Sequence, residues 1–145
     1  MKSEKPFTVR HASWALDAAH LKQVRHTVFV LEQGVPESLE WDSQDSVSEH
    51  WLAEHKDGLA LGTARMLDSG QIGRMAVLPE WRGTGIGRAL LTTVIDAAAQ
   101  RGFENVFLHA QLSAEPFYLA CGFRPEGDVF EEAGILHRAL RMAVQ

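Results

Sequence analysis

The 145-residue sequence contains little cysteine and no long apolar segment. Its one cysteine, Cys121, excludes an intramolecular disulfide framework and a cysteine-rich zinc site, and a free thiol is easier to keep in a reducing compartment. No run of 18 apolar residues is present, and the first eleven residues lack the apolar core of a secretory signal. We therefore predict a cytoplasmic protein without a membrane partner.

Positive charge is also scarce. The formal net charge of −5 argues against nucleic acid as a general partner, because contacts to phosphates require a basic face. No Lys or Arg lies between Arg25 and Lys56, whereas this acidic segment contains Glu32, Glu37, Glu40, Asp42, Asp45, Glu49 and Glu54. Two interpretations of the acidic segment stay open: it attracts a cation, or it is a solvated acidic face.

The N-terminal part of the chain predicts a strand followed by a helix. We find no internal repeat, low-complexity tract or linker, so residues 1–145 are expected to form a single domain. The alternating sequence FTVRH predicts the first strand. The spacing of Leu21, Val24, Val28 and Leu31 then predicts a helix over 17–31, with Asp17 as its N-cap or first-turn acid.

Strands dominate the middle of the chain. The runs EHWLAEH and LALGTARML flank Asp57-Gly58, a strong signal for a two-residue hairpin turn. A second turn at Ser69-Gly70 leads into IGRMAV, so three successive antiparallel strands are expected.

The C-terminal half alternates between helices and strands. Ile86, Leu90, Val94 and Ala97 recur at helical spacing, and Gly102 supplies a C-terminal stop. A short strand (NVFLHAQ), a short helix (AEPFYLACG) and two closing strands (FRPEGDVF and GILHRALRMAV) follow. The order β-α-β-β-β-α-β-α-β-β predicts an α+β fold in three layers: a mixed, mostly antiparallel sheet flanked by helices.

The glycine-rich stretch RGTGIGR at 82–88 lies between a predicted strand and a predicted helix. A nucleotide P-loop would require Lys after its last glycine, where Arg88 stands, and the glycine spacing also departs from the dinucleotide-binding fingerprint. Backbone N–H groups at such a helix start can instead hold a pyrophosphate. The simpler alternative is a turn that only reverses the chain.

The stretch RMAVLPEWRGTGIGRALL resembles the acyl-CoA-binding motif of the GNAT (Gcn5-related N-acetyltransferase) superfamily, and the element order over nearly the whole chain is also that of the superfamily. VFVLEQGVPESLEWDSQD, EHWL and FEEAGILHRAL are similar to its ElaA/YjcF-type branch. The resemblance implies acetyl-CoA as co-substrate, with the pantetheine arm along Met75, Ala76 and Val77. It places the pyrophosphate on Arg82, Gly83, Thr84, Gly85, Ile86, Gly87 and Arg88.

Acetyl transfer from a thioester to an amine sets three demands: a deprotonated amine, a stabilised oxyanion and a quenched thiolate. The resemblance implies that the Val77 amide binds the oxyanion and that Tyr118 serves the thiolate; a merely packed tyrosine is the alternative. Glu32 is the leading candidate for the base, against a solvated helix-end carboxylate. His50, His109 and a water-mediated base remain as further candidates.

Other residues carry weaker signals. Cys121 has no evident activating partner, so direct transfer within a ternary complex is preferred to an acyl-cysteine mechanism. His50 and His55 would point to opposite faces of a strand, and no metal is expected. Trp41 is a candidate cover of the acceptor site. Glu131, Glu132 and His137 either line that site or are surface charges.

The sequence therefore predicts an N-acetyltransferase that acts on a primary amine, either a small molecule or a lysine side chain. The acidic segment motivates a further hypothesis that the acceptor is cationic, such as a polyamine or an amino sugar. The alternatives are a non-catalytic acyl-CoA-binding or sensing module, and an acyltransferase that uses another acyl group or acceptor. A homodimer is possible by analogy with the family.

Overall fold

The structure, a computed structural model, describes residues 6–145; the first five of the eleven N-terminal residues considered in the sequence analysis lie outside the described residues. Its strands are β1 (Phe7–Ala12), β2 (Glu49–His55), β3 (Ala60–Met66), β4 (Gln71–Val77), β5 (Asn105–Gln111), β6 (Arg124–Glu132) and β7 (Ile135–Ala143). Its main helices are α1 (Trp14–Arg25), α2 (Glu37–Glu40), α3 (Ile86–Gln100) and α4 (Glu115–Ala120). A π-helix, η1 (His26–Glu32), continues α1, and short 3₁₀ turns occur at η2 (Asp45–Val47), η3 (Pro79–Trp81) and η4 (Leu112–Ala114).

The seven strands form one sheet in the order β1-β2-β3-β4-β5-β7-β6. All neighbouring strands are antiparallel except β4 and β5, which run parallel. The predicted α+β fold class and the order of its main elements are therefore confirmed. No helix among residues 6–145 is long and apolar enough to cross a membrane.

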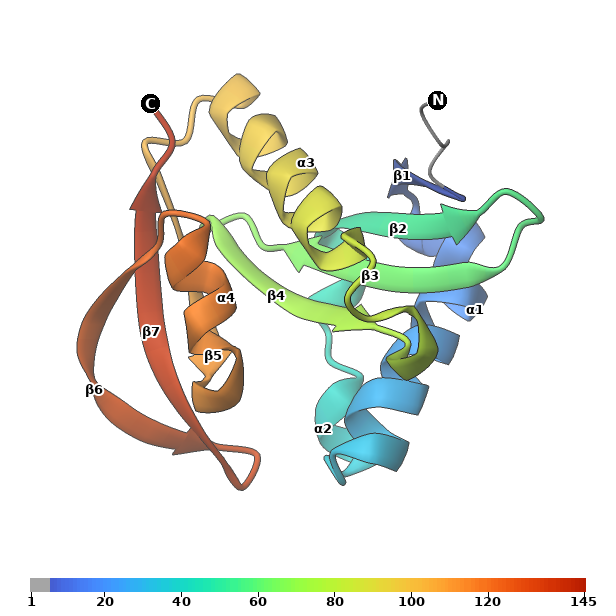
Figure 1. The fold of residues 1–145 in the computed structure, drawn as a ribbon, viewed down its shortest axis with the longest axis horizontal. Coiled ribbons are helices and arrows are strands. Elements are labelled where there is room, and N and C mark those ends of the chain that lie inside the picture. The colour runs from blue at the N-terminus through green and yellow to red at the C-terminus, as the bar shows by residue number, and fades with distance from the viewer. Residues whose placement is uncertain (1–5) are drawn as a thin grey trace.

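Helices pack on both faces of the sheet (Figure 1). The larger core contains Ile86, Leu90 and Val94 of α3, which pack against buried residues of β2–β5. The smaller core contains Leu21 and Val24 of α1 together with Val28 of η1. The periodicity that predicted these two helices thus marks their buried faces.

The first helix differs from the prediction at both ends. It starts at Trp14, three residues before Asp17, because the Asp17 carboxylate accepts a hydrogen bond from the Ser13 amide at 2.9 Å and so stabilises the first turn from inside the helix. Beyond Arg25 the chain continues as the π-helix η1. Its wider turn rotates the following side chains away from the α-helical register, and Leu31, expected on the buried face, is 69% exposed.

The β6–β7 hairpin turn offers a test of local strain. Glu132 pairs with Ile135 across a two-residue turn in which both Ala133 and Gly134 have positive φ, at 52° and 77°. Such a turn favours Asn-Gly, since asparagine tolerates this region better than alanine. We expect Ala133→Asn to stabilise the fold by about 0.5–1 kcal/mol, measured by urea unfolding. The same substitution at Ala143, outside any turn, should give no such gain.

Candidate functional site

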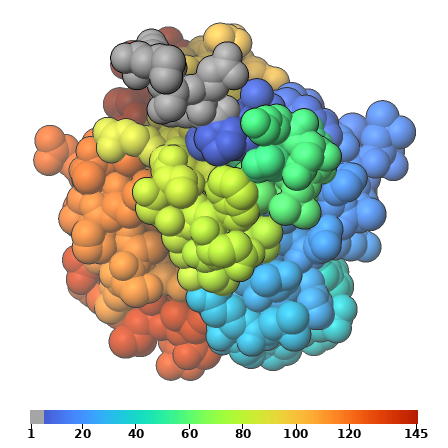
Figure 2. Space-filling view, turned by 45° about the vertical axis from the view of Figure 1, so that its right-hand side comes forward, coloured from blue at the N-terminus to red at the C-terminus, as the bar shows by residue number. Residues whose placement is uncertain are grey.

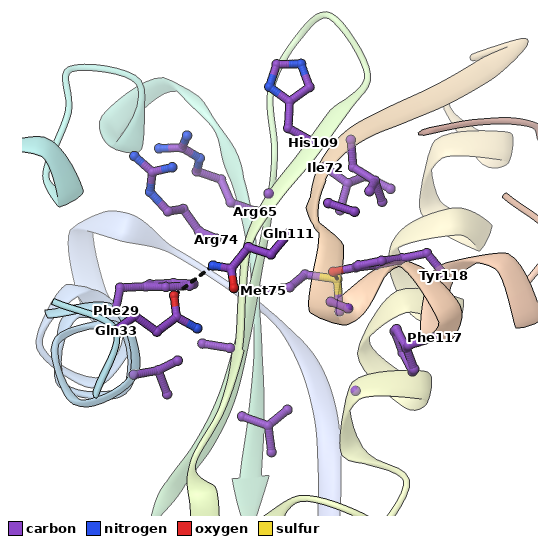
Figure 3. A pocket seen from close by; sticks show the side chains of 18 of the residues that line it. Phe29, Gln33, Arg65, Ile72, Arg74, Met75, His109, Gln111, Phe117 and Tyr118 are labelled. Atoms are coloured by element: carbon purple, nitrogen blue, oxygen red, sulfur yellow. Dashed lines mark hydrogen bonds between the residues drawn. The ribbon is translucent and has the colours of Figure 1, made fainter. Parts of the chain in front are cut away.

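The cavity opens where β4 and β5 separate. These strands pair only at Gln71–Phe107 and Ile72–Leu108, and they diverge beyond that point (Figure 1). A cavity of about 930 Å³ lies there, lined by both strands, by the glycine-rich loop, by α4 and by the end of the first helix. Figure 3 shows Phe29 and Gln33 on one side of this cavity and Phe117 and Tyr118 on the other.

The glycine-rich loop presents free backbone donors at the start of α3. Gly85 is the N-cap, with φ of 92°, and the first helical hydrogen bond runs from the Ala89 amide to the Gly85 carbonyl at 3.0 Å. The amides of Ile86, Gly87 and Arg88 therefore precede the helical ladder. The first turn contains no acidic residue that would compete for them. This end of α3 has the donors that an anion requires.

The Thr84 side chain fixes the loop from within, because its hydroxyl donates to the Trp81 carbonyl at 2.6 Å. At Gly83 and Gly85 an added Cβ would meet no atom within 4 Å, so the space beside both is open. The open space and positive φ together explain why glycine suits these positions. A turn alone would not require that space.

A β-bulge shapes β4 before the loop. Thr63 pairs with Ala76 and Arg65 with Gly73, so two residues of β4 face a single residue of β3. Arg74, one of the two, has φ of 46°, and its carbonyl accepts a hydrogen bond from the Thr63 hydroxyl at 2.9 Å. The bulge directs the chain so that Arg74 and Met75 both line the cavity.

The Val77 amide lies on the unpaired edge of β4. The next amide, of Leu78, donates to the Leu61 carbonyl on β3 at 2.9 Å. Since amides alternate between the two edges of a strand, the Val77 N–H faces the side from which β5 has diverged. Val77 also lines the cavity, so its amide is available to a ligand bound there.

Tyr118 enters the cavity from α4, opposite Met75 (Figure 3). Edge contacts with Phe117 and Phe123, at ring-centroid distances of 5.0 and 5.9 Å, fix the ring. The hydroxyl donates to the Met75 sulfur at 3.6 Å, which is a weak acceptor. Burial raises the pKa of Tyr118 to about 12.

Glu32 forms a bidentate ion pair with Arg82 instead of facing the cavity. The two carboxylate oxygens accept hydrogen bonds from the Arg82 guanidinium at 2.7 and 2.6 Å. In Figure 2 the blue surface of this part of the chain adjoins the yellow-green surface of the loop. The hydrogen bond from Arg82 holds the pKa of Glu32 below its usual value, and Arg82 also donates through Nε to the Val77 carbonyl at 3.1 Å. Glu32 is therefore placed to orient Arg82.

The two candidate histidines have different surroundings. His50 is buried away from the cavity, bonds through Nε2 to the Asp45 carbonyl at 2.7 Å and stacks on Trp14. Burial lowers the pKa of His50 and so favours its neutral form. His109 lines the cavity, and its Nδ1 lies 3.1 Å from the Glu132 carboxylate.

The carboxylates of the acidic segment form hydrogen bonds and ion pairs with other residues of the protein. Glu40 and Asp45 are buried and receive hydrogen bonds from Arg25 at 2.7 and 2.8 Å. The remaining acids also have partners: Asp42 bonds Arg65 and Arg74, Glu32 bonds Arg82, Glu37 bonds Trp41, Glu49 bonds Arg101 and Glu54 bonds Arg10. Both sequence interpretations of this segment, a free cation-attracting field and a solvated face, fail for Glu40 and Asp45, because arginines distant in sequence neutralise them.

The weaker candidates divide between the cavity wall and positions outside the cavity. Trp41 packs over Arg25 and Lys22 at 5.1 and 5.6 Å and does not line the cavity. Glu131 is exposed on β6, whereas Glu132 and His137 are part of the cavity wall. Cys121 is a free, half-buried thiol at the end of α4. Among the described residues, no cluster of His, Cys, Asp and Glu could hold a metal ion.

The sequence did not single out four polar residues of the cavity. Gln111 of β5 donates to Gln33 at 2.7 Å across the cavity (Figure 3). Arg65 and Arg74 form part of its wall. Their strands read as ordinary alternating patterns, and nothing in that pattern tells which polar side chains converge. The bulge that brings Arg74 into the cavity likewise has no sequence signature.

Comparisons with known proteins agree with this geometry. Residues 16–144 match the acetyltransferase (GNAT) domain family. The uncharacterized N-acetyltransferase YjcF of Bacillus subtilis (strain 168) is 37% identical over 117 residues, covering 79% of this chain and 84% of that protein. Protein ElaA of Escherichia coli (strain K12) is 33% identical over 125 residues, covering 81% of each chain.

A solved structure extends the match to the fold. The crystal structure of an acyl-CoA N-acyltransferase from Pseudomonas aeruginosa superposes with a TM-score of 0.84 at 31% identity, covering 94% of this chain and 99% of that one. The predicted resemblance to the ElaA/YjcF-type branch is confirmed, since both proteins that give the branch its name are among the relatives. The chain belongs to the GNAT acetyltransferase family and is an N-acyltransferase that uses acyl-CoA.

Proposed function

We propose that the protein transfers an acetyl group from acetyl-CoA to a primary amine by direct attack within a ternary complex. The observation that carries this proposal is the continuity of donors along one cavity. Three free amides at the start of α3 suit a diphosphate, and the unpaired edge of β4 leads from them to Val77 and Tyr118. An extended pantetheine arm would run along Met75, Ala76 and Val77 as an added strand does, and it would leave the Val77 amide free for the thioester oxygen.

The Val77 amide serves the oxyanion in this mechanism. A backbone donor aimed at the thioester oxygen stabilises the charge that develops in the transition state, and loss of one such donor typically costs about 10²–10³ in rate. Tyr118 interacts with the sulfur of the departing CoA. Its pKa of about 12 lies well above that of a thiol, so the phenol keeps its proton and stabilises the departing thiolate by a hydrogen bond.

The acceptor amine must lose a proton. Glu32 is a poor base, because its ion pair with Arg82 lowers its pKa. We instead assign to His109 the role of the base that removes this proton, directly or through water. The Glu132 carboxylate at Nδ1 favours the tautomer in which Nε2 is the free acceptor. His109 lies on the wall of the same cavity as Met75 and Gln111.

Gly87 provides a test that separates ligand binding from folding. A Cβ at Gly87 would meet Phe117 at 3.5 Å and Val77 at 3.9 Å, which are ordinary contacts, and alanine favours a helix by about 1 kcal/mol. The same Cβ would stand between the loop and the Val77 end of the cavity. We expect Gly87→Ala to keep or raise the stability of the fold but to weaken acetyl-CoA binding about 10–100-fold by calorimetry.

The control is Gly102→Ala, at the other end of α3, where the φ of 85° makes alanine destabilising; it should nevertheless leave acetyl-CoA affinity unchanged. Wild-type protein that shows no saturable binding of acetyl-CoA would contradict the proposed function. Tight binding of acetyl-CoA without transfer of the acetyl group to any amine would instead indicate a sensing module.

A further inference from the structure

Two guanidinium groups form the cavity wall opposite Tyr118. Figure 3 shows Arg65 and Arg74 side by side, on the far side of Met75 from the tyrosine ring. We infer that the amine acceptor carries an anionic group, a carboxylate or a phosphate, and that Arg65 and Arg74 bind it. This inference rests on the proposed function, because it assigns the end of the acceptor that does not react.

Arg74 occupies a backbone conformation that arginine seldom adopts. Its φ of 46° at the bulge lies in the left-handed region, which is unfavourable for a long side chain. Strain of this kind concentrates at functional sites, where the surrounding structure maintains it. Here the result is a guanidinium on the cavity wall, at a point where a regular strand would alternate to the other face.

The existing partners hold Arg74 loosely. Its hydrogen bonds to the Leu39 carbonyl, the Glu40 carbonyl and the Asp42 carboxylate measure 3.4, 3.3 and 3.2 Å. Arg25, in the same cluster, bonds the Glu40 carboxylate at 2.7 Å. Because hydrogen bonds weaken as they lengthen beyond about 3.0 Å, Arg74 can exchange its partners for a ligand more readily than Arg25.

Arg65 contributes a donor that the protein does not use. The residue is only 6% exposed, and its Nη1 bonds Asp42 at 2.8 Å and Asp45 at 3.0 Å. Its buried Nε has no hydrogen-bond partner among residues 6–145. Nε and Nη2 together form the fork that binds a carboxylate or phosphate with two parallel hydrogen bonds. A buried charged donor without an acceptor is costly, so this edge calls for an anion.

The charge of the surrounding cluster points the same way. Three guanidiniums, of Arg25, Arg65 and Arg74, face the three carboxylates of Glu40, Asp42 and Asp45. Burial raises the pKa of Glu40, with Arg74 and Arg25 opposing the shift, and the same burial lowers the pKa of Arg74. Because these three positive and three negative charges balance, the cluster offers a cationic acceptor no net attraction, contrary to the hypothesis drawn from the acidic segment.

A matched set of acceptors tests the inference. Butylamine, 4-aminobutyrate, 3-aminopropyl phosphate and 1,4-diaminobutane are offered to the acetyl-CoA-loaded protein. Transfer is followed by thiol release, and binding to the CoA-saturated protein is followed by calorimetry. We expect at least one of the two anionic amines to exceed both butylamine and diaminobutane by about 10–100-fold in kcat/KM or in affinity. Comparison of 4-aminobutyrate with 3-aminopropyl phosphate shows whether the site prefers a carboxylate or a phosphate.

Variants of Arg74 then locate the effect. Arg74→Gln should reduce the preference for the anionic amine about 10-fold or more, and Arg74→Lys, which keeps the charge but not the fork, should lose part of it. Arg141→Gln, at an exposed ion pair, should retain the full preference. If Arg74→Gln unfolds, the lysine variant carries the comparison, with the melting temperature and acetyl-CoA affinity as checks of folding.

The inference is overturned if neither anionic amine is preferred in transfer or binding, or if the preference is insensitive to both Arg74 variants. Failure of the proposed function has a different signature, namely no saturable binding of acetyl-CoA. Binding of 4-aminobutyrate or 3-aminopropyl phosphate to the free protein remains measurable in that case, so the two failures are distinguishable.

Discussion

Tyr118→Phe should reduce turnover by about 10–10³-fold while leaving the affinity for acetyl-CoA within about twofold. The substitution removes only the hydroxyl, which donates a hydrogen bond to the Met75 sulfur at 3.6 Å. The ring keeps its edge contacts with Phe117 and Phe123, so the fold and the cavity wall should remain intact. The expected loss arises because the departing thiolate would have no hydrogen-bond donor from α4.

Steady-state kinetics and calorimetry on the same preparations check this prediction. Phe123→Leu is the control, since it disturbs the packing of the tyrosine without removing its hydroxyl, and it should cost stability more than chemistry. Unchanged kcat in Tyr118→Phe would remove the tyrosine from the mechanism. It would leave the assignment of the CoA loop intact.

Arg25→Met should destabilise the protein by about 3–5 kcal/mol. Arg25 is 1% exposed and bonds two buried carboxylates, of Glu40 and Asp45, at 2.7 and 2.8 Å. Removing the guanidinium leaves both carboxylates in a low-dielectric interior without their closest donor. Equilibrium unfolding in urea, with the midpoint and slope fitted together, measures the loss.

A matched exposed pair supplies the control. Arg141 bonds Glu126 at 2.7 Å, the same distance as Arg25 to Glu40, but both partners are about half exposed. Arg141→Met should therefore cost about 1 kcal/mol or less, since water replaces the lost contact. Adding Glu40→Gln to Arg25→Met should restore part of the stability, because it removes one of the stranded charges. Equal losses at the two arginines would show that burial does not set the effect.

The pattern of apolar residues determined most of the fold. The predicted helix after the glycine-rich loop is confirmed as α3, where Ile86, Leu90, Val94 and Ala97 are all buried on one face. The hairpin around Asp57-Gly58 and the three antiparallel strands are also confirmed. The predicted two-residue turn is wrong: the His55 amide donates to the Leu59 carbonyl at 2.8 Å, so the loop has three residues, 56–58. These features are local, since spacing and turn chemistry within a short window decide them.

The site was only partly predictable. The glycine-rich loop could be located from the sequence because its backbone conformation, with positive φ at Gly83 and Gly85, favours glycine, and glycine spacing is visible in the sequence. The roles of Val77, Tyr118 and the loop residues stay predictions, based on the resemblance and on the cavity that now contains them. The acidic segment was misjudged because its partners, Arg25, Arg65 and Arg74, come from three separate elements that sequence spacing does not bring together.

The sequence by itself determined which segments form helices and strands, where the chain turns and which glycine-rich loop precedes a helix. The tertiary structure alone decided which charged side chains meet. It pairs Glu32 with Arg82, buries Glu40 against Arg25 and turns Arg74 into the cavity through a bulge. The physical reason is that local propensity depends on neighbours in the chain, whereas charge pairing depends on distances that only the packed sheet and helices fix.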